Sequence, residues 1–233
     1  AGIIAVLVYP MNALAEDQIG RLRDLLAGTG ISFGMYVGKT PERTTDVPGQ
    51  RLGPGASRED YRRALERALA ERRGTAVHPF EERCSREEMR TPGRQPRILL
   101  TNVKQLELLL TRQIDAELFD GARLEFLVFD EAHTFAGTIG AETACLIRRL
   151  RAFCGKDPKQ TVCVATSATI ADPERGPEAA RSFASRFFGV AENDVFLVGE
   201  EYEPDVWAST RAVSPPLLGD PATHLRDVLA AVD

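Results

Sequence analysis

The chain has 233 residues, of which 43% are hydrophobic and 27% are charged, a composition typical of a soluble globular protein with a sizeable core. No apolar run approaches the roughly 18 residues that a membrane-spanning helix needs. The first residues include neither a Met nor a basic segment, so we expect no signal peptide, a cytoplasmic location and a fragment of a longer protein. The net charge of −5 does not indicate nucleic-acid binding, although backbone amides bind phosphate without basic side chains.

The four cysteines contain no C-x-x-C pair and are spread over four predicted elements or loops: Cys84, Cys145, Cys154 and Cys163. We interpret them as small apolar thiols of a reducing compartment rather than as metal ligands. The three His residues are expected to lie apart from them.

Short apolar runs alternate with helical segments along the chain. The runs, each the length of a strand, are residues 3–9, 31–37, 97–101, 124–129, 161–165 and 195–198. Helices are expected at 13–27, 103–112 and 141–153. Nearly continuous Val, Ile and Leu runs that alternate with helices predict a parallel sheet covered on both faces, which is a doubly wound α/β fold.

Two stretches depart from this alternation. Residues 41–96 contain twelve arginines, no lysine and ten acidic residues, with a helix expected at 58–73 that carries Tyr61, Leu65 and Leu69 on one stripe. We favour a solvated, partly mobile insertion here, and the alternative is an insertion that contacts DNA. Residues 199–221 are rich in Pro and acids and indicate a linker, followed by a closing helix at 222–232.

Two adjacent acids follow the fourth apolar run, where residues 127–133 have the sequence LVFDEAH. Asp130 ends a strand at the edge where ligands bind in open α/β sheets, and it could hold Mg²⁺ through water. Glu131 could orient or deprotonate an attacking water, and His133 could link the site to the next element. The alternative is a simple acidic helix cap.

Small hydroxyl residues follow the fifth apolar run, where residues 166–169 have the sequence TSAT. Hydroxyl groups at a strand end can donate hydrogen bonds to acids on the neighbouring strand. A Ser/Thr-rich turn without a functional role would also explain this string. The order and spacing of the two motifs, separated by one crossover helix, favour the functional interpretation.

Two asparagines follow predicted strands and are interpreted as helix N-caps. Asn12 follows the first run, and Asn102 follows the third with Gln105 at capping-box spacing. Helix N-termini at one sheet edge can bind phosphate groups without basic side chains, although each Asn alone is more often a simple cap. Together with the acid pair they suggest a track for a sugar-phosphate backbone.

These strings together resemble the first RecA-like domain of a superfamily 2 helicase of the DEAD/DEAH-box group. VFDEAH at 128–133 matches motif II, TSAT at 166–169 matches motif III, YPMNALAEDQ at 9–18 is similar to motif Ia, and ILLTN at 98–102 to motif Ib. The string REEMRTPGRQPRILLTN at 86–102 further resembles bacterial DNA helicases that have Y-P-M-N-A-L at motif Ia, including repair and phage-defence enzymes. The resemblance covers about residues 3–200. It implies a partial RecA-like domain at 1–200, containing the insertion, and a linker with a closing helix at 201–233.

The resemblance implies an ATP-dependent motor that acts on nucleic acid, most plausibly DNA, with ATP and Mg²⁺ as cofactors. Its nucleotide-site residues would be Asp130, Glu131 and His133, with Asp130 binding the metal. Coupling to domain movement would involve Ser167, Ala168 and Thr169. Nucleic-acid contacts would come from Pro10, Asn12, Ala13, Gly38, Thr101 and Asn102. A second RecA-like domain would be the partner within the full-length chain, and RNA remains an alternative substrate.

The sequence departs from the family pattern at the phosphate-binding loop. Residues 34–40, GMYVGKT, have three residues between the glycines instead of four, and Pro41 follows where a helix should begin. We therefore expect the chain alone to be inactive in ATP hydrolysis. A second hypothesis is a binding or scaffold domain, without the loop, that contacts DNA or a partner and does not hydrolyse ATP.

The resemblance also implies a gap in the sheet, because the family's phosphate-loop strand lies between the strand at 161–165 and the last strand, at 195–198. An empty gap of two strand spacings, roughly 9–10 Å, leaves backbone groups unpaired. We expect residues 195–198 to slide in and pair directly with 161–165. The competing outcome is a dimer formed through the exposed strand edge.

Overall fold

The computed structural model describes residues 2–71, 76–167 and 176–199. The chain divides into two units, Ala1–Leu197 and Val198–Asp233, and the elements below belong to the first. The expected closing helix at 222–232 and nearly all of the expected linker lie outside the described residues. Among the helices that the structure describes, none is long and apolar enough to cross a membrane.

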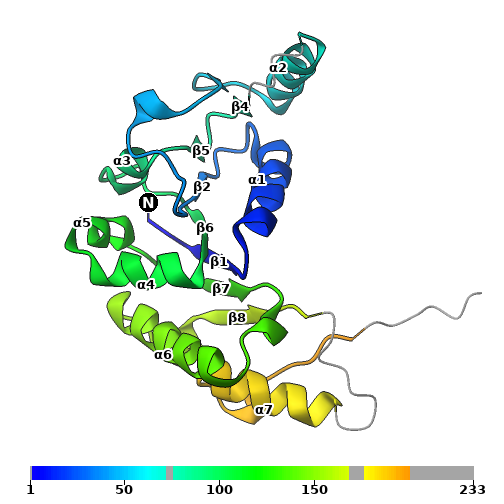
Figure 1. Cartoon of the computed structure of the whole chain (residues 1–233), viewed down its shortest axis with the longest axis vertical. Coiled ribbons are helices and arrows are strands. Elements are labelled where there is room, and N and C mark those ends of the chain that lie inside the picture. The colour runs from blue at the N-terminus through cyan, green and yellow to red at the C-terminus, as the bar shows by residue number, and fades with distance from the viewer. Residues whose placement is uncertain (1, 72–75, 168–175, 200–233) are drawn as a thin grey trace, which may run out of the picture. The chain divides into compact units, whose positions relative to one another are not determined.

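Six strands form one sheet in the order β5-β2-β6-β1-β7-β8, and every pairing between them is parallel (Figure 1). The strands are β1 (Ala5–Tyr9), β2 (Phe33–Met35), β5 (Glu82–Arg83), β6 (Ile98–Asn102), β7 (Phe126–Phe129) and β8 (Val162–Ala165). Two further short strands, β3 (Gln50–Arg51) and β4 (Val77–His78), pair with each other. The predicted parallel α/β fold of RecA-like type is confirmed.

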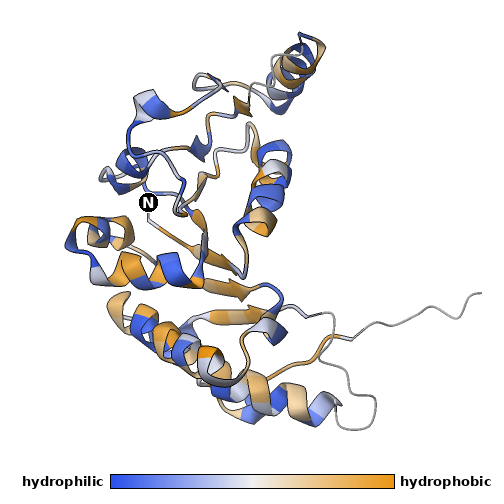
Figure 2. Ribbon diagram, viewed as in Figure 1, coloured by the Kyte–Doolittle hydropathy of each residue, from blue (hydrophilic) through white to orange (hydrophobic). Residues whose placement is uncertain are grey.

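Helices cover both faces of this sheet. They are α1 (Asn12–Leu26), α2 (Arg58–Ala70), α3 (Arg86–Arg90), α4 (Val103–Thr111), α5 (Gln113–Ala116), α6 (Gly137–Phe153) and α7 (Gly176–Phe188). The larger core places α4, α6 and α7 against Val6, Leu99 and Leu127, and α1 covers the other face at Phe33 and Leu100. Strands β1, β7 and β8 are accordingly hydrophobic along the ribbon, whereas the short edge strand β5 is hydrophilic (Figure 2).

A cluster of aromatic rings fixes the end of β7. The ring of Phe129 lies edge-on to Phe135, Phe187 and Phe188, with centroids 5.1–6.1 Å apart. Phe129 is fully buried. Because edge-to-face aromatic pairs favour one geometry, this cluster holds the residue that follows Phe129, which is Asp130, in a defined position.

The expected strand at 195–198 does not form, and its expected pairing with β8 is wrong. Phe196 and Val198 are 86% and 97% exposed, and β8 has no second partner strand among the described residues. Between the two segments, residues 176–188 form α7, which packs against α6. Within the described part of the chain this edge of β8 has no partner, and an edge-to-edge dimer stays a prediction.

The insertion at 41–96 is better ordered than expected. It contributes β5 to the sheet, and Glu82 and Glu88 within it are only 3% and 4% exposed. Arginines neutralise both acids, with Arg23 Nε 2.7 Å from Glu82 and Arg51 Nη2 2.9 Å from Glu88. The sequence predicted a solvated insertion, because ion pairs between residues far apart in the chain leave no local pattern.

The predicted helix within the insertion is confirmed as α2, which begins with a capping box between Ser57 and Asp60. Tyr61 is buried as expected. Leu69 is 70% exposed, contrary to the predicted stripe, because the buried face of α2 runs through Tyr61 and Ala64 instead.

Candidate functional site

The predicted motifs gather at the carboxyl edge of the sheet. Since all six strands run in the same direction, their C-terminal ends lie along one edge, where ligands bind in open α/β folds. Along this edge the order is the Gly38 turn after β2, Thr101 and Asn102 of β6, Asn12 after β1, Asp130 after β7 and Thr166 after β8. The expected nucleic-acid residues therefore occupy one half of the edge, and the expected nucleotide residues occupy the other.

Thr166 connects the acid pair to the neighbouring strand. Its hydroxyl donates a short hydrogen bond to Asp130 Oδ1 and accepts a 3.3 Å bond from the backbone N–H of Glu131. The Thr166 backbone also accepts from the N–H of Ala132 at 2.8 Å and donates to the carbonyl of Phe129 at 3.0 Å. The first residue of TSAT thus orients both acids, as the predicted hydroxyl–carboxylate pairing requires.

The backbone turns sharply at Glu131, which adopts a left-handed conformation with φ 50° and ψ 49°. A non-glycine residue in this region is uncommon and is held by its surroundings, here by the bonds to Thr166. The turn brings His133 back toward the next motif, so that its Nδ1 lies 3.1 Å from Ser167 Oγ and 3.3 Å from Glu131 Oε2. Ala168 and Thr169 lie outside the described residues.

Tyr9 lies at the boundary between the two halves of the edge. Burial and the nearby negative charge of Asp130 raise the pKa of Tyr9 to about 12. The phenol therefore stays neutral at physiological pH and adds no charge beside the acid pair.

The acid pair fits a hard divalent cation. Mg²⁺ prefers carboxylate and hydroxyl oxygens and keeps several waters. Asp130 is only partly buried, which leaves space for water beside its carboxylate, and Thr166 directs a further oxygen toward it. Asp130 would hold the cation, and the charge that Mg²⁺ supplies when bound would offset that of nucleotide phosphates.

The second half of the edge is tied together by two asparagines. Asn102 caps α4 by accepting a 2.7 Å bond from the N–H of Gln105, as predicted, and its amide donates a 2.7 Å bond to Asn12 Oδ1. The prediction that Asn12 caps α1 is wrong, because Met11 is the N-cap and Asn12 is the first helical residue. Its side chain instead accepts from Asn102, an interaction between residues ninety apart in sequence.

The remaining predicted nucleic-acid residues differ in accessibility. Ala13 and Gly38 are exposed and Pro10 is half-buried. Thr101 is fully buried, and its hydroxyl donates a 2.8 Å bond to the carbonyl of Tyr36. Its side chain is thus not available to a ligand, and Thr101 instead fixes the turn that carries Gly38.

Sequence reasoning missed a cluster of potential metal ligands in the insertion. His78, Glu82 and Cys84 bring their ligand atoms within 4.8 Å of one another, contrary to the expectation that the His residues lie apart from the cysteines. However, Arg23 already donates to both Glu82 oxygens, at 2.7 and 2.8 Å, and burial raises the pKa of the Cys84 thiol. A second cation is disfavoured beside this guanidinium, so we interpret the cluster as structural.

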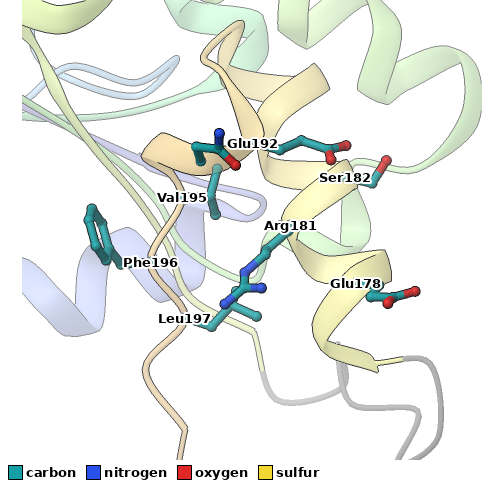
Figure 3. Close-up of a pocket in the computed structure, with 8 residues that line it drawn as sticks. Glu178, Arg181, Ser182, Glu192, Val195, Phe196 and Leu197 are labelled. Carbon is teal, nitrogen blue, oxygen red and sulfur yellow. The ribbon is translucent and has the colours of Figure 1, made fainter.

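A hollow of about 720 Å³ lies between α7 and residues 192–197 (Figure 3). Its lining includes Glu178, Arg181 and Glu192 but none of the predicted site residues. The hollow is open and lined by surface charges, and it gives no indication of a reaction. The carboxyl edge therefore remains the candidate site.

Comparisons with known proteins agree with the motifs. A family model described as DEAD/DEAH box helicase matches residues 59–175. The Druantia protein DruE of Escherichia coli (strain UMEA 4076-1) is 26% identical over 251 residues, which covers 75% of this chain and 13% of that protein. The uncharacterized ATP-dependent helicase YprA of Bacillus subtilis (strain 168) is 46% identical over 54 residues, 22% of this chain and 7% of that protein.

A crystal structure of the DUF1998 helicase MrfA bound to DNA and AMPPNP is also similar, with a TM-score of 0.46 and 25% identity. It matches 81% of this chain and 20% of the MrfA chain. The chain thus spans only a small part of each of these relatives. With an acid pair, a hydroxyl motif and two helix N-termini at one sheet edge, and a family model that matches half of its length, the chain belongs to the DEAD/DEAH box helicase family.

Proposed function

We propose that this chain forms part of the motor of an ATP-dependent DNA helicase or translocase, and that its carboxyl edge serves both ATP hydrolysis and strand binding. The observation that carries the proposal is the order of side chains along that edge, where Asp130 and Thr166 follow β7 and β8, and Asn102 follows β6. One rigid sheet thereby supports a nucleotide half and a nucleic-acid half.

In the nucleotide half, Asp130 would hold Mg²⁺ through water and Glu131 would accept the proton of the attacking water or orient that water. Thr166 keeps both acids in place through its hydroxyl. ATP dependence is supported by family membership and by the similarity to YprA, whose name describes an ATP-dependent helicase.

The link between His133 and Ser167 is proposed to couple hydrolysis to movement. It joins the loop after β7 to the loop after β8 at 3.1 Å, so a movement of one loop would displace the other. Ser167, with Ala168 and Thr169, would transmit the change to a second RecA-like domain of the full-length protein.

In the nucleic-acid half, the N-terminus of α1 and the Asn102 cap would face the sugar-phosphate backbone, with further contact from the Gly38 turn. Helix N-termini carry a partial positive charge and free N–H groups, which suits phosphate. We propose DNA rather than RNA because the Y-P-M-N-A-L string at 9–14 is similar to that of bacterial DNA helicases. A cytoplasmic location is part of this proposal and is supported by four free cysteines.

The test is ATP turnover by the purified full-length protein that contains this chain, measured without nucleic acid, with single-stranded DNA and with single-stranded RNA. We expect turnover that DNA stimulates, and we expect Glu131→Gln to reduce it by about a hundredfold or more, as loss of a catalytic base does. Equal stimulation by RNA would contradict the assignment to DNA. Nucleic-acid binding without any turnover would favour the alternative, a scaffold domain.

A further inference from the structure

The turn that follows β2, residues 36–40, has an exposed tip on a buried base. Gly38 and Lys39 are exposed, whereas Tyr36 and Val37 are fully buried and Thr40 is 8% exposed. The turn lies beside β6, because the N–H of Tyr36 donates to the carbonyl of Leu100 at 2.8 Å. It therefore stands next to Asn102 at the nucleic-acid half of the edge.

Four consecutive carbonyl oxygens of this turn accept hydrogen bonds from the protein itself. Met35 accepts from the hydroxyl of Thr40 at 2.8 Å, and Tyr36 accepts from the hydroxyl of Thr101 at 2.8 Å. The carbonyls of Val37 and Gly38 both accept from Nη2 of Arg86, at 3.0 and 2.8 Å. The negative ends of these peptide dipoles are thus directed into the protein.

The amides at the tip have the opposite arrangement. Among the described residues, no acceptor bonds to the backbone N–H of Gly38 or of Lys39, while Val37 donates to Thr40 Oγ1 at 2.9 Å. A Cβ added at Gly38 would meet no atom within 4 Å, so the space beside this residue is open. Two successive N–H groups that have no acceptor among the described residues are both free to donate to an anion.

Arg86 is the residue best placed to maintain this polarity. Its guanidinium lies over the Tyr36 ring, 5.1 Å from the centroid, and only 16% of its side chain is exposed. Tyr36 in turn donates a 2.5 Å bond to Asp115 Oδ1, and Asp115 is fully buried. The ring thus supports one face of the guanidinium, and its Nη1 lies 3.8 Å from Glu42 Oε2, so the group is positioned by more than its bonds to the two carbonyls.

We propose that Arg86 is a positioning residue for nucleic-acid binding, which turns the Val37 and Gly38 carbonyls inward so that the Gly38 and Lys39 amides face a backbone phosphate. This inference rests on the proposed function of the edge. Arg86 lies in the insertion, outside motifs Ia, Ib, II and III, so the proposal gives part of the insertion a role in the site. Arg86 does not itself contact the phosphate in this account.

The experiment measures binding of fluorescein-labelled oligo(dT) to the full-length protein by anisotropy, over a series of salt concentrations. The variants are Arg86→Ala, Arg86→Lys and the control Arg83→Ala. Arg83 provides a matched control because it also donates to two carbonyls, those of Phe80 and Arg94, and also lies over an aromatic ring, but touches no residue of the turn. Thermal unfolding of each variant verifies that it is folded.

We expect Arg86→Ala to weaken binding about tenfold, the effect of losing one charge-assisted hydrogen bond to phosphate. We expect an unchanged slope of log affinity against log salt, because amide contacts release no counterions. Arg86→Lys should give an intermediate loss, since one ammonium cannot reach both carbonyls with fork geometry. Arg83→Ala should remain within about twofold of wild type.

Other outcomes overturn the inference. A salt slope reduced by about 1 in Arg86→Ala would show that Arg86 contacts a phosphate directly. Unchanged affinity would show that it has no role. If Arg86→Ala does not fold, Gly38→Ala takes its place, because its methyl group enters open space and should block the phosphate. Unchanged binding by that variant also overturns the inference. Failure of the wild type to bind oligo(dT) would instead reject the proposed function.

Discussion

The amide of Asn102 donates a 2.7 Å hydrogen bond to Asn12 Oδ1, which joins the start of α4 to the start of α1. The two helices follow adjacent strands, β6 and β1, so the bond fixes the distance between the two helix N-termini. A strand of nucleic acid that crosses this half of the edge would meet both N-termini in a set register.

Replacing Asn102 should therefore weaken strand binding. Asn102→Ala removes the α4 cap, at a cost of about 1 kcal/mol of stability, and frees the side chain of Asn12. We expect several-fold weaker binding of oligo(dT). The matched control is Arg62→Ala with Arg63→Ala, because Arg62 is already paired with Asp24 at 2.8 Å and Arg63 with Glu59 at 3.3 Å. If the arginine changes abolish binding and Asn102→Ala does not affect it, the insertion is the binding surface.

The 233-residue chain alone should not hydrolyse ATP. Its sequence contains no G-x-x-x-x-G-K-[ST] loop, and phosphoryl transfer needs that loop and its Lys to hold the phosphates. Phosphate release is measured with the purified chain, with and without single-stranded DNA. Turnover that Glu131→Gln abolishes would contradict this expectation, whereas turnover that survives Glu131→Gln would identify a contaminating enzyme.

The ion pair between Arg23 and Glu82 should make the protein less stable at acidic pH. Burial raises the pKa of Glu82, but hydrogen bonds from Arg23 and His78 outweigh it and hold the pKa below the ordinary value of 4.5. A depressed carboxyl pKa contributes stability that is present above pH 4.5 and is lost as pH falls through the folded-state pKa. The free energy of unfolding of the wild type, measured with urea, should therefore fall more steeply below pH 4.5 than that of Glu82→Gln.

Removing the cation of this buried pair should destabilise the fold more than removing the cation of an exposed pair. Arg23→Ala leaves a carboxylate that is 3% exposed without its main partner, which costs about 3 kcal/mol. Arg21→Ala is the control on the same helix, because its pair with Asp17 is exposed at 72% and 60%. Equal unfolding free energies for the two variants at pH 7 would show that the buried pair contributes no more than a surface pair.

The open edge of β8 should promote self-association of the isolated chain. Val162 and Val164 are 56% and 39% exposed beside a strand edge that no other described residue pairs with, an arrangement that native sheets usually protect. We expect a mass that rises with concentration in sedimentation experiments, and a monomer for Val162→Lys. Ile139→Lys, at a helical position that is 57% exposed, provides the control. A wild-type chain that is monomeric at all concentrations would contradict the predicted edge-to-edge dimer.

The sequence predicted the parts of the fold that repeat a local pattern. Strand-length apolar runs located β1, β6, β7 and β8, because burial on both faces makes such strands continuously hydrophobic. The two-residue strand β5 carries no such pattern, and neither does the pairing of Glu82 with Arg23, fifty-nine residues away. Residues 195–198 have a strand's composition but pair with no strand that the structure describes, so apolar content alone does not make a strand.

The sequence predicted which residues form the candidate site but not the hydrogen bonds between them. The motif strings located Asp130, Thr166 and Asn102 at strand ends, and parallel strands place such ends on one edge. That Thr166 bonds to both acids, or that Arg86 reaches the Gly38 turn, depends on which strands are neighbours. Periodicity carries no information about that order.

The central claim is that one sheet edge has two separable halves, and the most direct test is ATP turnover of the full-length protein as a function of single-stranded DNA concentration. We predict that Asn102→Ala raises the DNA concentration needed for half-maximal stimulation and preserves turnover at saturation, whereas Glu131→Gln abolishes turnover and preserves DNA binding. Loss of DNA binding in Glu131→Gln, or loss of saturated turnover in Asn102→Ala, would contradict the division of the edge.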